Sequence, residues 1–577
     1  MTLNQALSAV KSRPNPGGDG ALCFLACGFE PLHLTTLLHA SLLERSPGSY
    51  IGINSGLYGD LSGNLRLAAE SKADATAVLV EWSDIDPRLG LRSSGGWSHD
   101  VLSDIAASCV QRLARIETAI GKLAPLMPVA VSPPCLPLPP VGGTIGAQSD
   151  TLELELESRL ASFLRALANV PGVRILQRSH PALAAIPPAD RLDARMELLS
   201  GFPYKLPFAG VLAESLATLL FPPAPKKGLI TDLDDTLWHG LVGEIGPDSV
   251  SWNQEHHSQI HGLYQQMLGH LADCGVLLAV CSKNELSVVE TALARKDLLL
   301  KSDSLFPVLA GWGPKSQAVA RILQTWNIHE DAVVFIDDNP MELEEVRRAF
   351  PGITCRQFNA KDAAGVWNLL GELRNLFGKP LITQEDQLRQ ASIRASARIQ
   401  EIGGASDSPE FLRGLEGSVT LNWHLDPSDK RALELINKTN QFNLNGIRVA
   451  EAEWQRLLSH PDTILGVVSY SDKFGPLGRI GVIAGSRDGA SVEVKHWVLS
   501  CRAFSRRIEH HTLHGLFHDH GVDEIRFAFQ TTERNQPARE FFRSLGIKPD
   551  STGGYAILNN DFFSRGGELP HRTVSQK

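Results

Sequence analysis

One acidic segment constrains this chain more than any other feature of its sequence. The apolar run Gly228–Thr231 leads directly into Asp232 and, two residues later, Asp234. Such a run predicts a buried parallel strand, and open α/β sheets bind ligands at the carboxyl ends of their strands. An aspartate there can attack phosphorus, while a second carboxylate protonates the leaving oxygen and later deprotonates water. Because clustered carboxylates repel a phosphate group, this chemistry calls for a neutralising Mg²⁺ ion.

An acidic strand end that stands alone is more often a capped turn. In this chain, however, three later segments carry polar groups that could act with Asp232 and Asp234. The apolar residues 276–281 are followed by Ser282, whose hydroxyl can bind a phosphoryl oxygen. Lys315 supplies a cation at the expected start of a helix, and a third apolar run ends at Asp337 and Asp338. This ordered set resembles the motifs of the haloacid dehalogenase (HAD) superfamily of phosphohydrolases.

The HAD resemblance implies a role for each of these residues. Asp232 is expected to be the nucleophile, and Asp234 the general acid and base. Ser282 and Lys315 are expected to hold the phosphoryl group. The implied metal ligands are Asp232, Asp234, Asp337 and Asp338. The segments between the motifs are too short for a folded cap domain, and HAD enzymes without a cap tend to act on large or protein-tethered substrates.

Longer stretches around the motifs narrow the resemblance to one group. Residues 232–244, 281–284, 335–340 and 435–444 resemble the FkbH-like proteins. These proteins take D-1,3-bisphosphoglycerate, load a glyceryl unit onto an acyl carrier protein thiol for polyketide or related assembly, and remove the remaining phosphate. The resemblance therefore implies a small phosphorylated substrate and a carrier partner with a phosphopantetheine arm. Asp235 stands where we expect asparagine in many relatives, and it adds charge near the metal.

A basic turn is predicted in the carboxyl-terminal part. Residues 492–498 are expected to form a strand, and Arg502, Arg506 and Arg507 follow at the start of a helix. A strand, a basic turn and a helix amino terminus together form an anion site. We expect this turn to receive the phosphopantetheine arm of an acidic carrier protein. The alternative interpretation is that the arginines belong to a solvated helix face.

The segment 531–546, which includes Asn535, resembles the last strand–helix unit of the GNAT-type N-acetyltransferases. That family binds the pyrophosphate of coenzyme A on a glycine-containing loop, and this chain has Ser505 and Arg507 at the glycine positions. Side chains there hinder close approach of the backbone to pyrophosphate. The single phosphate of a carrier arm therefore fits the expected α+β domain better than acetyl-coenzyme A, and Asn535 is counted among its binding residues.

A covalent acyl relay would need a thiol, and two cysteines are candidates. Cys281 ends an expected strand beside Ser282, and Cys501 lies at the basic turn, where a helix amino terminus lowers a thiol pKa. Either cysteine can instead be a small buried apolar residue, and the sequence does not decide between them.

The chain alternates apolar strands and amphipathic helices, which predicts parallel sheets covered on both faces. We expect an α/β multidomain protein. Its predicted parts are an SGNH-hydrolase-like domain at 1–222, a capless HAD Rossmann-like domain at 223–380, a helical linker at 381–415 and a GNAT-like α+β domain at 416–577. Within the linker, residues 383–401 are expected to form one helix.

The amino-terminal domain is expected to bind or to act as a scaffold. SGNH hydrolases carry a nucleophilic serine in the turn after their first strand, but residues 27–30 of this chain include no serine. The polar loops 54–59 and 84–92 follow expected strands and could face a partner, although ordinary surface loops are the commoner outcome.

Composition excludes several classes of function. A net charge of −9 argues against a general nucleic-acid binder. No apolar run approaches the roughly 20 residues of a membrane span. The 8 cysteines show no pairing rhythm, which predicts reduced thiols and a cytoplasmic protein.

Three functions remain open from the sequence. The first is a Mg²⁺-dependent enzyme of FkbH type that forms a glyceryl carrier protein. The second is a HAD phosphatase that acts on another phosphorylated metabolite or a glycan precursor, with a structural GNAT-like domain. The third is a non-catalytic scaffold that binds a carrier protein, and the intact set of acidic motifs weighs against it.

Overall fold

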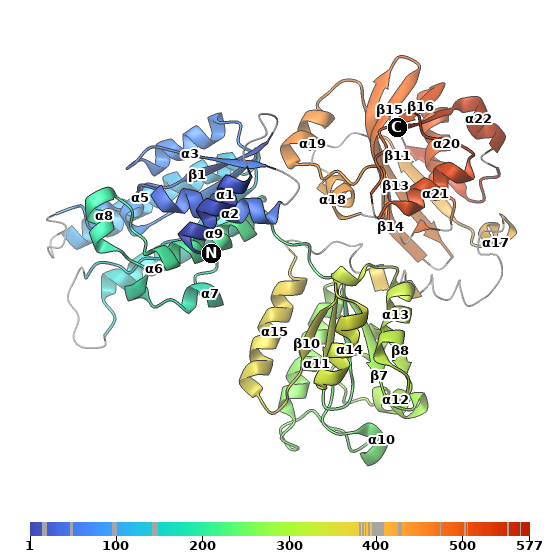
Figure 1. Cartoon of the computed structure of the whole chain (residues 1–577), viewed down its shortest axis with the longest axis horizontal. Helices are drawn as coiled ribbons and strands as arrows, with labels where there is room; N and C mark the ends of the chain where they lie inside the picture. The colour runs from blue at the N-terminus through green and yellow to red at the C-terminus, as the bar shows by residue number, and fades with distance from the viewer. Residues whose placement is uncertain are drawn as a thin grey trace. The chain divides into compact units, whose positions relative to one another are not determined.

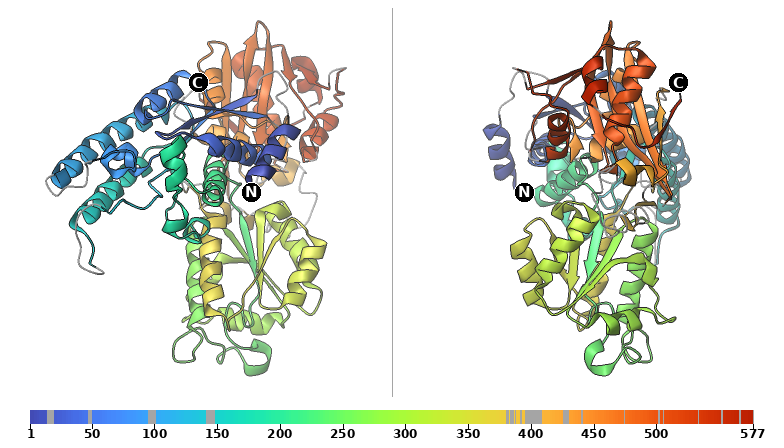
Figure 2. Two further views of the ribbon diagram at one scale, coloured as in Figure 1. Left: turned by 60° about the vertical axis from the view of Figure 1, so that its left-hand side comes forward. Right: turned by 90° about the vertical axis from the view of Figure 1, so that its right-hand side faces the viewer.

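The computed structural model describes the chain except residues 14–19, 47–49, 95–100, 141–147, 380–381, 383–385, 387, 391–392, 395–408, 425–429, 440, 474, 501–502, 505, 533, 551–552, 566 and 577. The chain divides into two compact units, Met1–Pro223 with Ala450–Ala452, and Ala224–Val449 with Glu453–Lys577. The described residues form three sheets; Figure 1 labels many of their strands, and Figure 2 shows the chain from two other directions. Within the described residues, none of the helices has both the length and the apolar character that a membrane span requires.

The first sheet has five parallel strands in the order β2-β1-β3-β4-β5. They are β1 (Ala21–Ala26), β2 (Ile51–Ser55), β3 (Ala75–Leu79), β4 (Val129–Ser132) and β5 (Val173–Ile175). One face is covered by α1 (Leu3–Ser12), α2 (Leu32–Arg45) and α9 (Leu206–Leu220). The other is covered by α3 (Leu61–Glu70), α5 (Leu102–Leu123) and α6 (Thr151–Ala168). Short helices α4 (Trp82–Ile85), α7 (Pro181–Ala184) and α8 (Ala194–Ser200) lie in the connections.

The second sheet also has five parallel strands, in the order β10-β9-β6-β7-β8. They are β6 (Gly228–Thr231), β7 (Leu277–Ser282), β8 (Leu305–Ala310), β9 (Val333–Asp337) and β10 (Thr354–Gln357). The helices are α10 (Val242–Ile245), α11 (Gln259–Asp273), α12 (Leu286–Leu293), α13 (Lys315–Trp326), α14 (Pro340–Ala349) and α15 (Ala363–Phe377). Successive residues of β6 face opposite sides: Leu229 packs with α11, α12 and α15, and Ile230 with α13 and α14.

The predicted linker helix 383–401 lies largely outside the described residues. Residues 386, 388–390 and 393–394 are helical. Asp386 forms ion pairs with Lys379, at 2.9 Å, and with Arg389. The Arg389 side chain also donates a hydrogen bond to the carbonyl of Gly275 at 2.9 Å, so the start of this segment lies against the second sheet's domain.

The third sheet is mixed, with the order β17-β16-β15-β14-β13-β11-β18, and β12 pairs with β15 beside this path. Its strands are β11 (Ser418–Asn422), β12 (Phe442–Asn443), β13 (Thr463–Asp472), β14 (Gly475–Asp488), β15 (Ser491–Leu499), β16 (Glu524–Phe527), β17 (Tyr555–Leu558) and β18 (Arg572–Gln576). Two pairs, β15 with β16 and β11 with β18, are parallel. The helices are α17 (Pro409–Arg413), α18 (Lys430–Lys438), α19 (Glu451–Leu458), α20 (Ile508–His520), α21 (Gln536–Ser544) and α22 (Asn559–Arg565).

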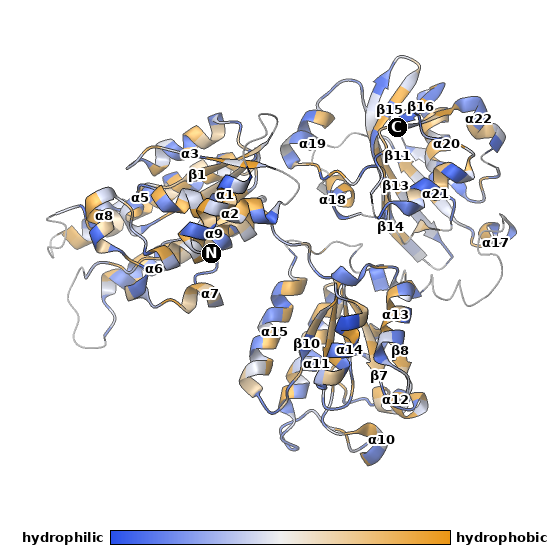
Figure 3. Cartoon of the chain, in the orientation of Figure 1, coloured by the Kyte–Doolittle hydropathy of each residue, from blue (hydrophilic) through white to orange (hydrophobic). Residues whose placement is uncertain are grey.

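Each sheet carries its own apolar core. In Figure 3 the central strands are coloured mostly as hydrophobic, while the helices alternate between hydrophobic and hydrophilic residues. In the third sheet Trp497 faces the cluster that includes α20 and α21, and the next residue, Val498, faces α18 and α19. The predicted α/β multidomain class is therefore confirmed, with two parallel sheets and one mixed sheet.

Candidate active site

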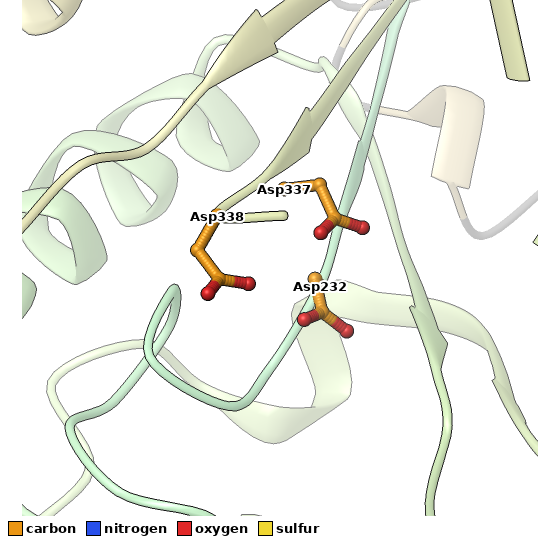
Figure 4. Close-up of side chains that lie close together, drawn as sticks. All are labelled: Asp232, Asp337 and Asp338. Carbon is orange, nitrogen blue, oxygen red and sulfur yellow. The ribbon is translucent and has the colours of Figure 1, made fainter. Parts of the chain in front are cut away.

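The register of two neighbouring strands brings the first and last acidic motifs together. β6 and β9 pair in parallel with Thr231 opposite Ile336. Asp232 follows β6 directly and Asp337 is the last residue of β9, so the two emerge side by side. The amide nitrogen of Asp232 donates a hydrogen bond to the carbonyl of Ile336 at 2.9 Å. Figure 4 shows the carboxylates of Asp232, Asp337 and Asp338 turned toward a common space.

Lys315 joins two of these carboxylates. It is the first residue of α13, and its Nζ lies 2.9 Å from Oδ1 of Asp232 and 2.5 Å from Oδ2 of Asp337. All three side chains are buried. Burial acts to lower the pKa of the Lys315 ammonium, but the charges of Asp232 and Asp337 outweigh it, and the pKa is raised. Lys315 therefore stays charged inside the site.

Burial disfavours the ionised form of the acids in this cluster. It raises the pKa of Asp232 to about 7, against the opposing charge of Lys315 and with a further rise from Asp337. Burial also raises the pKa of Asp337. The pKa of Asp338 rises to about 6, through burial first and then the charge of Asp337. One lysine does not neutralise three acids, so the cluster favours a further cation.

The donor set of this cluster fits a hard divalent metal ion. One carboxylate oxygen from each of Asp232, Asp337 and Asp338 lies within 4.8 Å of the other two. Carboxylate oxygens are the ligands that Mg²⁺ and Ca²⁺ prefer. Asp234, the fourth ligand expected from the sequence, is not in this group, and its carboxylate is held by other partners.

Three N–H groups fix the carboxylate of Asp234. Its Oδ1 accepts hydrogen bonds from Nε1 of Trp238 at 2.9 Å and from the amide nitrogen of Val242 at 3.0 Å. Its Oδ2 accepts from Nδ2 of Asn284 at 2.9 Å. These donors orient the side chain in one position. The sequence analysis gave no role to Trp238 or Asn284, although both stand inside the segments that carry the resemblance.

Asp235 turns the chain sharply after these two aspartates. Its φ of 49° lies in the left-handed region, and its Oδ1 accepts a hydrogen bond from the amide of Gly240 at 2.9 Å. Asparagine and aspartate both tolerate this backbone conformation and both offer a side-chain oxygen. Aspartate at position 235, where asparagine is expected in many relatives, therefore supports the same loop geometry as asparagine.

β7 ends with a hydroxyl at the site and a thiol in the core. Ser282 is buried, and its Oγ accepts a hydrogen bond from Nδ2 of Asn284 at 3.0 Å. The neighbouring Cys281 packs in the cluster with α13 and α14, and burial raises its thiol pKa to about 12. A neutral thiol is a poor nucleophile, so this environment disfavours Cys281 as an acyl relay. The other candidate, Cys501, lies outside the described residues.

Short connections surround the site. Between β6 and β7 the chain forms α10 and α11, and between β7 and β8 it forms α12 and a short 3₁₀ turn (Ser302–Ser304). All of residues 224–379 are described, and they contain no cap domain. The site therefore stays open at the carboxyl ends of the strands.

The basic turn of the third sheet's domain has mainly internal contacts where it is described. Arg506 is buried, with its Nε 3.6 Å from Oδ2 of Asp472 and its guanidinium carbon 5.7 Å from the ring centre of Tyr470. Arg507 is half-buried and stands just before α20 with a φ of 55°. Arg502 falls outside the described residues. Arg506 is therefore held by the domain itself rather than presented on its surface.

Asn535 is also held by the protein interior. It is fully buried, and its Nδ2 donates hydrogen bonds to the carbonyls of Asn443, at 3.2 Å, and Gln530, at 2.8 Å. Its Oδ1 accepts a hydrogen bond from the amide of Thr532 at 2.9 Å. Its amide thus ties β12 to the loop after β16, so it has a structural task here.

The segment that contains β12 and Asn445 occupies the space between the ends of β15 and β16. These parallel strands pair only over Ser491–Val494 and Glu524–Phe527. Beyond that point, β12 pairs with the end of β15. Nδ2 of Asn445 then bridges the two strands, donating hydrogen bonds to the carbonyls of Lys495 at 2.8 Å and Ala528 at 3.3 Å. A carrier arm would have to displace this segment to enter between the strands.

Comparison with known proteins gives a structural likeness to a solved protein. No protein-family model matches the sequence, and no curated protein matches it. A domain from Methanocaldococcus jannaschii is 12% identical with a TM-score of 0.20, covering 25% of this chain and 99% of that one, and this score is too low to use. The N-terminal part of the protein BF1531 from Bacteroides fragilis, which contains a phosphatase domain and was crystallised with Mg, is 20% identical with a TM-score of 0.50. The match covers 66% of this chain and 100% of that chain, so the two share a fold.

Proposed function

We propose that this chain is a Mg²⁺-dependent HAD-type phosphatase. The observation that carries the proposal is the convergence of Asp232, Lys315 and Asp337 at one sheet edge, with ion-pair distances of 2.9 and 2.5 Å. The shared fold with a phosphatase-containing protein that was complexed with Mg supports the same conclusion. A buried acid beside a buried lysine at an open strand end is the arrangement that phosphoryl transfer needs.

Each residue then has a defined task. A carboxylate oxygen of Asp232 attacks phosphorus, an O–P bond forms, and the bond from phosphorus to the leaving oxygen breaks. Asp234 gives its proton to that leaving oxygen. Water then attacks the aspartyl phosphate and passes a proton to Asp234, which frees Asp232 and inorganic phosphate. The Ser282 hydroxyl and the Lys315 ammonium bind the oxygens of the phosphoryl group.

Asp232, Asp337 and Asp338 would hold the metal ion. Bound Mg²⁺ supplies positive charge that offsets the repulsion between the acids and the phosphate group. Burial raises the pKa of Asp232 to about 7 and that of Asp338 to about 6, and a bound cation would favour the ionised form of both.

Phosphate release in the presence of Mg²⁺ and of EDTA tests this function. We expect the full chain to release phosphate from a small ester such as p-nitrophenyl phosphate with Mg²⁺, and to lose that activity with EDTA. Restoring Mg²⁺ should restore the activity. Turnover that persists in EDTA would contradict the proposed mechanism.

We further propose that the natural reaction forms a glyceryl unit on an acyl carrier protein. The carrier thiol attacks C1 of D-1,3-bisphosphoglycerate, a C–S bond forms, and the C1–O bond to the phosphate breaks. The thiol proton is lost to solvent. The HAD site then hydrolyses the remaining C3 phosphate. Direct attack by the carrier thiol is preferred to a relay through Cys281 because that thiol is buried and its pKa is raised to about 12.

Exposed apolar side chains near the site support a macromolecular substrate. Several residues that follow the strands of the second sheet at their carboxyl ends are exposed: Leu241 (42%), Ile245 (46%), Leu286 (43%), Trp312 (78%) and Met341 (77%). Large exposed apolar residues favour contact with another protein. No cap domain covers the carboxyl ends of these strands.

Intact-mass measurement on holo-carrier proteins tests the carrier reaction. With bisphosphoglycerate and the right carrier, we expect the carrier to gain a glyceryl mass. Trp312→Ala should slow phosphate removal from the carrier-bound substrate, but leave p-nitrophenyl phosphate turnover unchanged. The matched control is Trp367→Ala, because Trp367 is 66% exposed on α15 beside the edge strand β10.

The outcome also separates the competing functions. Phosphate release without any carrier loading would favour a phosphatase for another metabolite or a glycan precursor. Carrier binding without phosphate release from any substrate would favour a scaffold. Equal effects of Trp312→Ala on both substrates would contradict the proposed docking edge.

A further inference from the structure

The amino-terminal domain contains a cavity of about 550 Å³ at the carboxyl ends of its central strands. Its lining includes Gly28 and Phe29 after β1, Tyr58 and Gly59 after β2, and Asp84 after β3. In the strand order, β1 lies between β2 and β3. The connection after β1 therefore runs to one side of the sheet, and the connection after β2 crosses back to the other side. Open α/β sheets bind ligands at such a switch point. The cavity is of the size that holds a small molecule.

Two arginines give this cavity a cationic wall. Arg112 and Arg115 are three residues apart on α5, so they share one face of that helix, and both line the cavity. Neither forms a hydrogen bond or ion pair with the residues that the structure describes, apart from a charge effect of Arg112 on Asp84. Both side chains are exposed, and guanidinium groups without an ion-pair partner beside a concave site favour an anionic ligand.

The other charged groups of the lining are already engaged. Arg92 donates a hydrogen bond to the carbonyl of Glu197 at 2.9 Å and lies over the ring of Tyr58 at 5.4 Å. Glu197 also forms an ion pair with Arg92 at 3.5 Å. Asp60 caps α3 by accepting a hydrogen bond from the amide of Gly63 at 2.7 Å. These groups shape the walls and leave Arg112 and Arg115 for a ligand.

Gly28, after β1, lies close to the Asp84 side chain. A Cβ atom on Gly28 would lie 1.7 Å from Oδ1 of Asp84, so a side chain there would require this carboxyl group to move. Burial raises the pKa of Asp84 to about 7, with a smaller opposing effect from Arg112. A substantial fraction of this carboxyl is neutral near pH 7, and it then repels an anion little.

We propose that this cavity binds a small metabolite through an anionic group, a phosphate or a carboxylate, held by Arg112 and Arg115. The ligand is bound without covalent chemistry. The proposal stands apart from the phosphatase site, because it rests on different residues in the first sheet's domain. It gives the domain a ligand-binding role.

Calorimetric titration of the full chain tests this site. Inorganic phosphate and succinate are titrated separately in EDTA, which withholds metal from the carboxylate cluster of Asp232. We expect saturable binding of at least one of these anions. Arg112→Ala combined with Arg115→Ala should weaken it by at least about tenfold, since each charged hydrogen bond contributes strongly. The control Arg165→Ala, an exposed arginine on α6, should leave binding unchanged.

The two anions distinguish the ligand chemistry. Binding of phosphate alone assigns a phosphorylated ligand, binding of succinate alone assigns a carboxylate, and binding of both assigns recognition by charge. The double variant should keep its phosphatase turnover. Absence of saturable binding for both anions, or wild-type affinity in the double variant, would overturn the proposal. Arg115→Gln provides a second variant that keeps the size and polarity of the side chain, and it should weaken binding in the same direction.

Discussion

At the scale of single residues, the aspartates of one short loop occupy three different environments. Asp232 is buried against Lys315. Asp234 accepts three hydrogen bonds from N–H groups. Asp235 is more exposed and accepts one from the amide of Gly240. Identical side chains within four residues therefore have separate tasks, and the same change to asparagine at each position gives a matched set of variants.

Asp232→Asn should abolish phosphate release while the fold is kept. The substitution removes the attacking carboxylate at nearly constant volume, and loss of a nucleophile costs at least about 10³-fold in kcat. Steady-state assays with Mg²⁺ measure this, with thermal unfolding as the check on folding. Asp235→Asn is the control, because asparagine also tolerates a φ of 49° and still accepts from Gly240. Activity in Asp232→Asn would remove Asp232 from the role of nucleophile.

Asp234→Asn should lower kcat by about 10²–10⁴-fold, the usual contribution of proton transfer. Substrate binding should persist, since Asp234 contacts Trp238, Val242 and Asn284 and is not part of the carboxylate cluster. Phosphate-release kinetics and a direct binding measurement together separate the two effects. Wild-type turnover in this variant would show that another group moves the proton.

At the scale of elements, strand ends and helix starts place most of the site. Asp232 directly follows β6, while β7 and β9 end at Ser282 and Asp337, and α13 begins at Lys315. Parallel strands put their carboxyl ends at one edge, so residues about 50 apart in sequence become neighbours there. In the third sheet, β12 and Asn445 fill the gap between two strands instead.

Asn445→Ala should destabilise the third sheet's domain. The change removes two hydrogen bonds that bridge β15 to the loop after β16. Two neutral hydrogen bonds contribute about 1–3 kcal/mol to the free energy of unfolding. Denaturant unfolding measures the loss, and Asn560→Ala, an exposed asparagine on α22, is the control. An unchanged unfolding midpoint would show that the bridge adds no stability.

At the scale of the whole molecule, the described residues form three sheets with separate apolar cores. A buried acid in one core therefore affects the stability of its own domain. Glu81 is such a group: it accepts hydrogen bonds from the Tyr204 hydroxyl at 2.7 Å and from the amide nitrogens of Cys135 and Leu136 at 3.3 Å. Burial raises its pKa from 4.5 to about 8, although these three donors oppose the rise.

The first sheet's domain should lose stability as the pH rises from about 5 to about 8. In this window folded Glu81 keeps its proton while the unfolded chain loses it, so the native state binds more protons and higher pH favours unfolding. The stabilisation by Glu81 is complete below the pKa that this carboxyl has in the unfolded chain. It is lost as the pH rises past the pKa that the carboxyl has in the folded protein. Glu81→Gln should flatten this dependence, apart from a contribution of the same sign from Asp84, whose pKa is about 7.

Hydrogen exchange of peptides from β3 and β4 measures the stability of the first sheet's domain within the full chain. The control is Glu214→Gln, because Glu214 is exposed on α9 and its substitution should leave the pH dependence intact. An increase of protection with rising pH would contradict the prediction.

The sequence by itself determined the parallel sheets and the edge at which the site lies. Apolar runs that end in Asp232, Ser282 and Asp337 are local patterns, and strand geometry converts each pattern into a position at the sheet edge. Residues 27–30 include no serine, and the loss of a hydrolase nucleophile in this domain stays a prediction.

The tertiary structure decided which partners those residues meet. Three features depend on contacts between distant segments. Lys315 forms ion pairs with Asp232 and Asp337, and Arg506 is buried beside Asp472. Asn445 bridges the ends of β15 and β16. A basic turn looks the same in sequence whether its arginines face solvent or an internal acid. The cavity beside Arg112 likewise forms because α5 packs on one face of the first sheet, against strands formed earlier in the chain. Packing of side chains between remote elements leaves no local signal in the sequence.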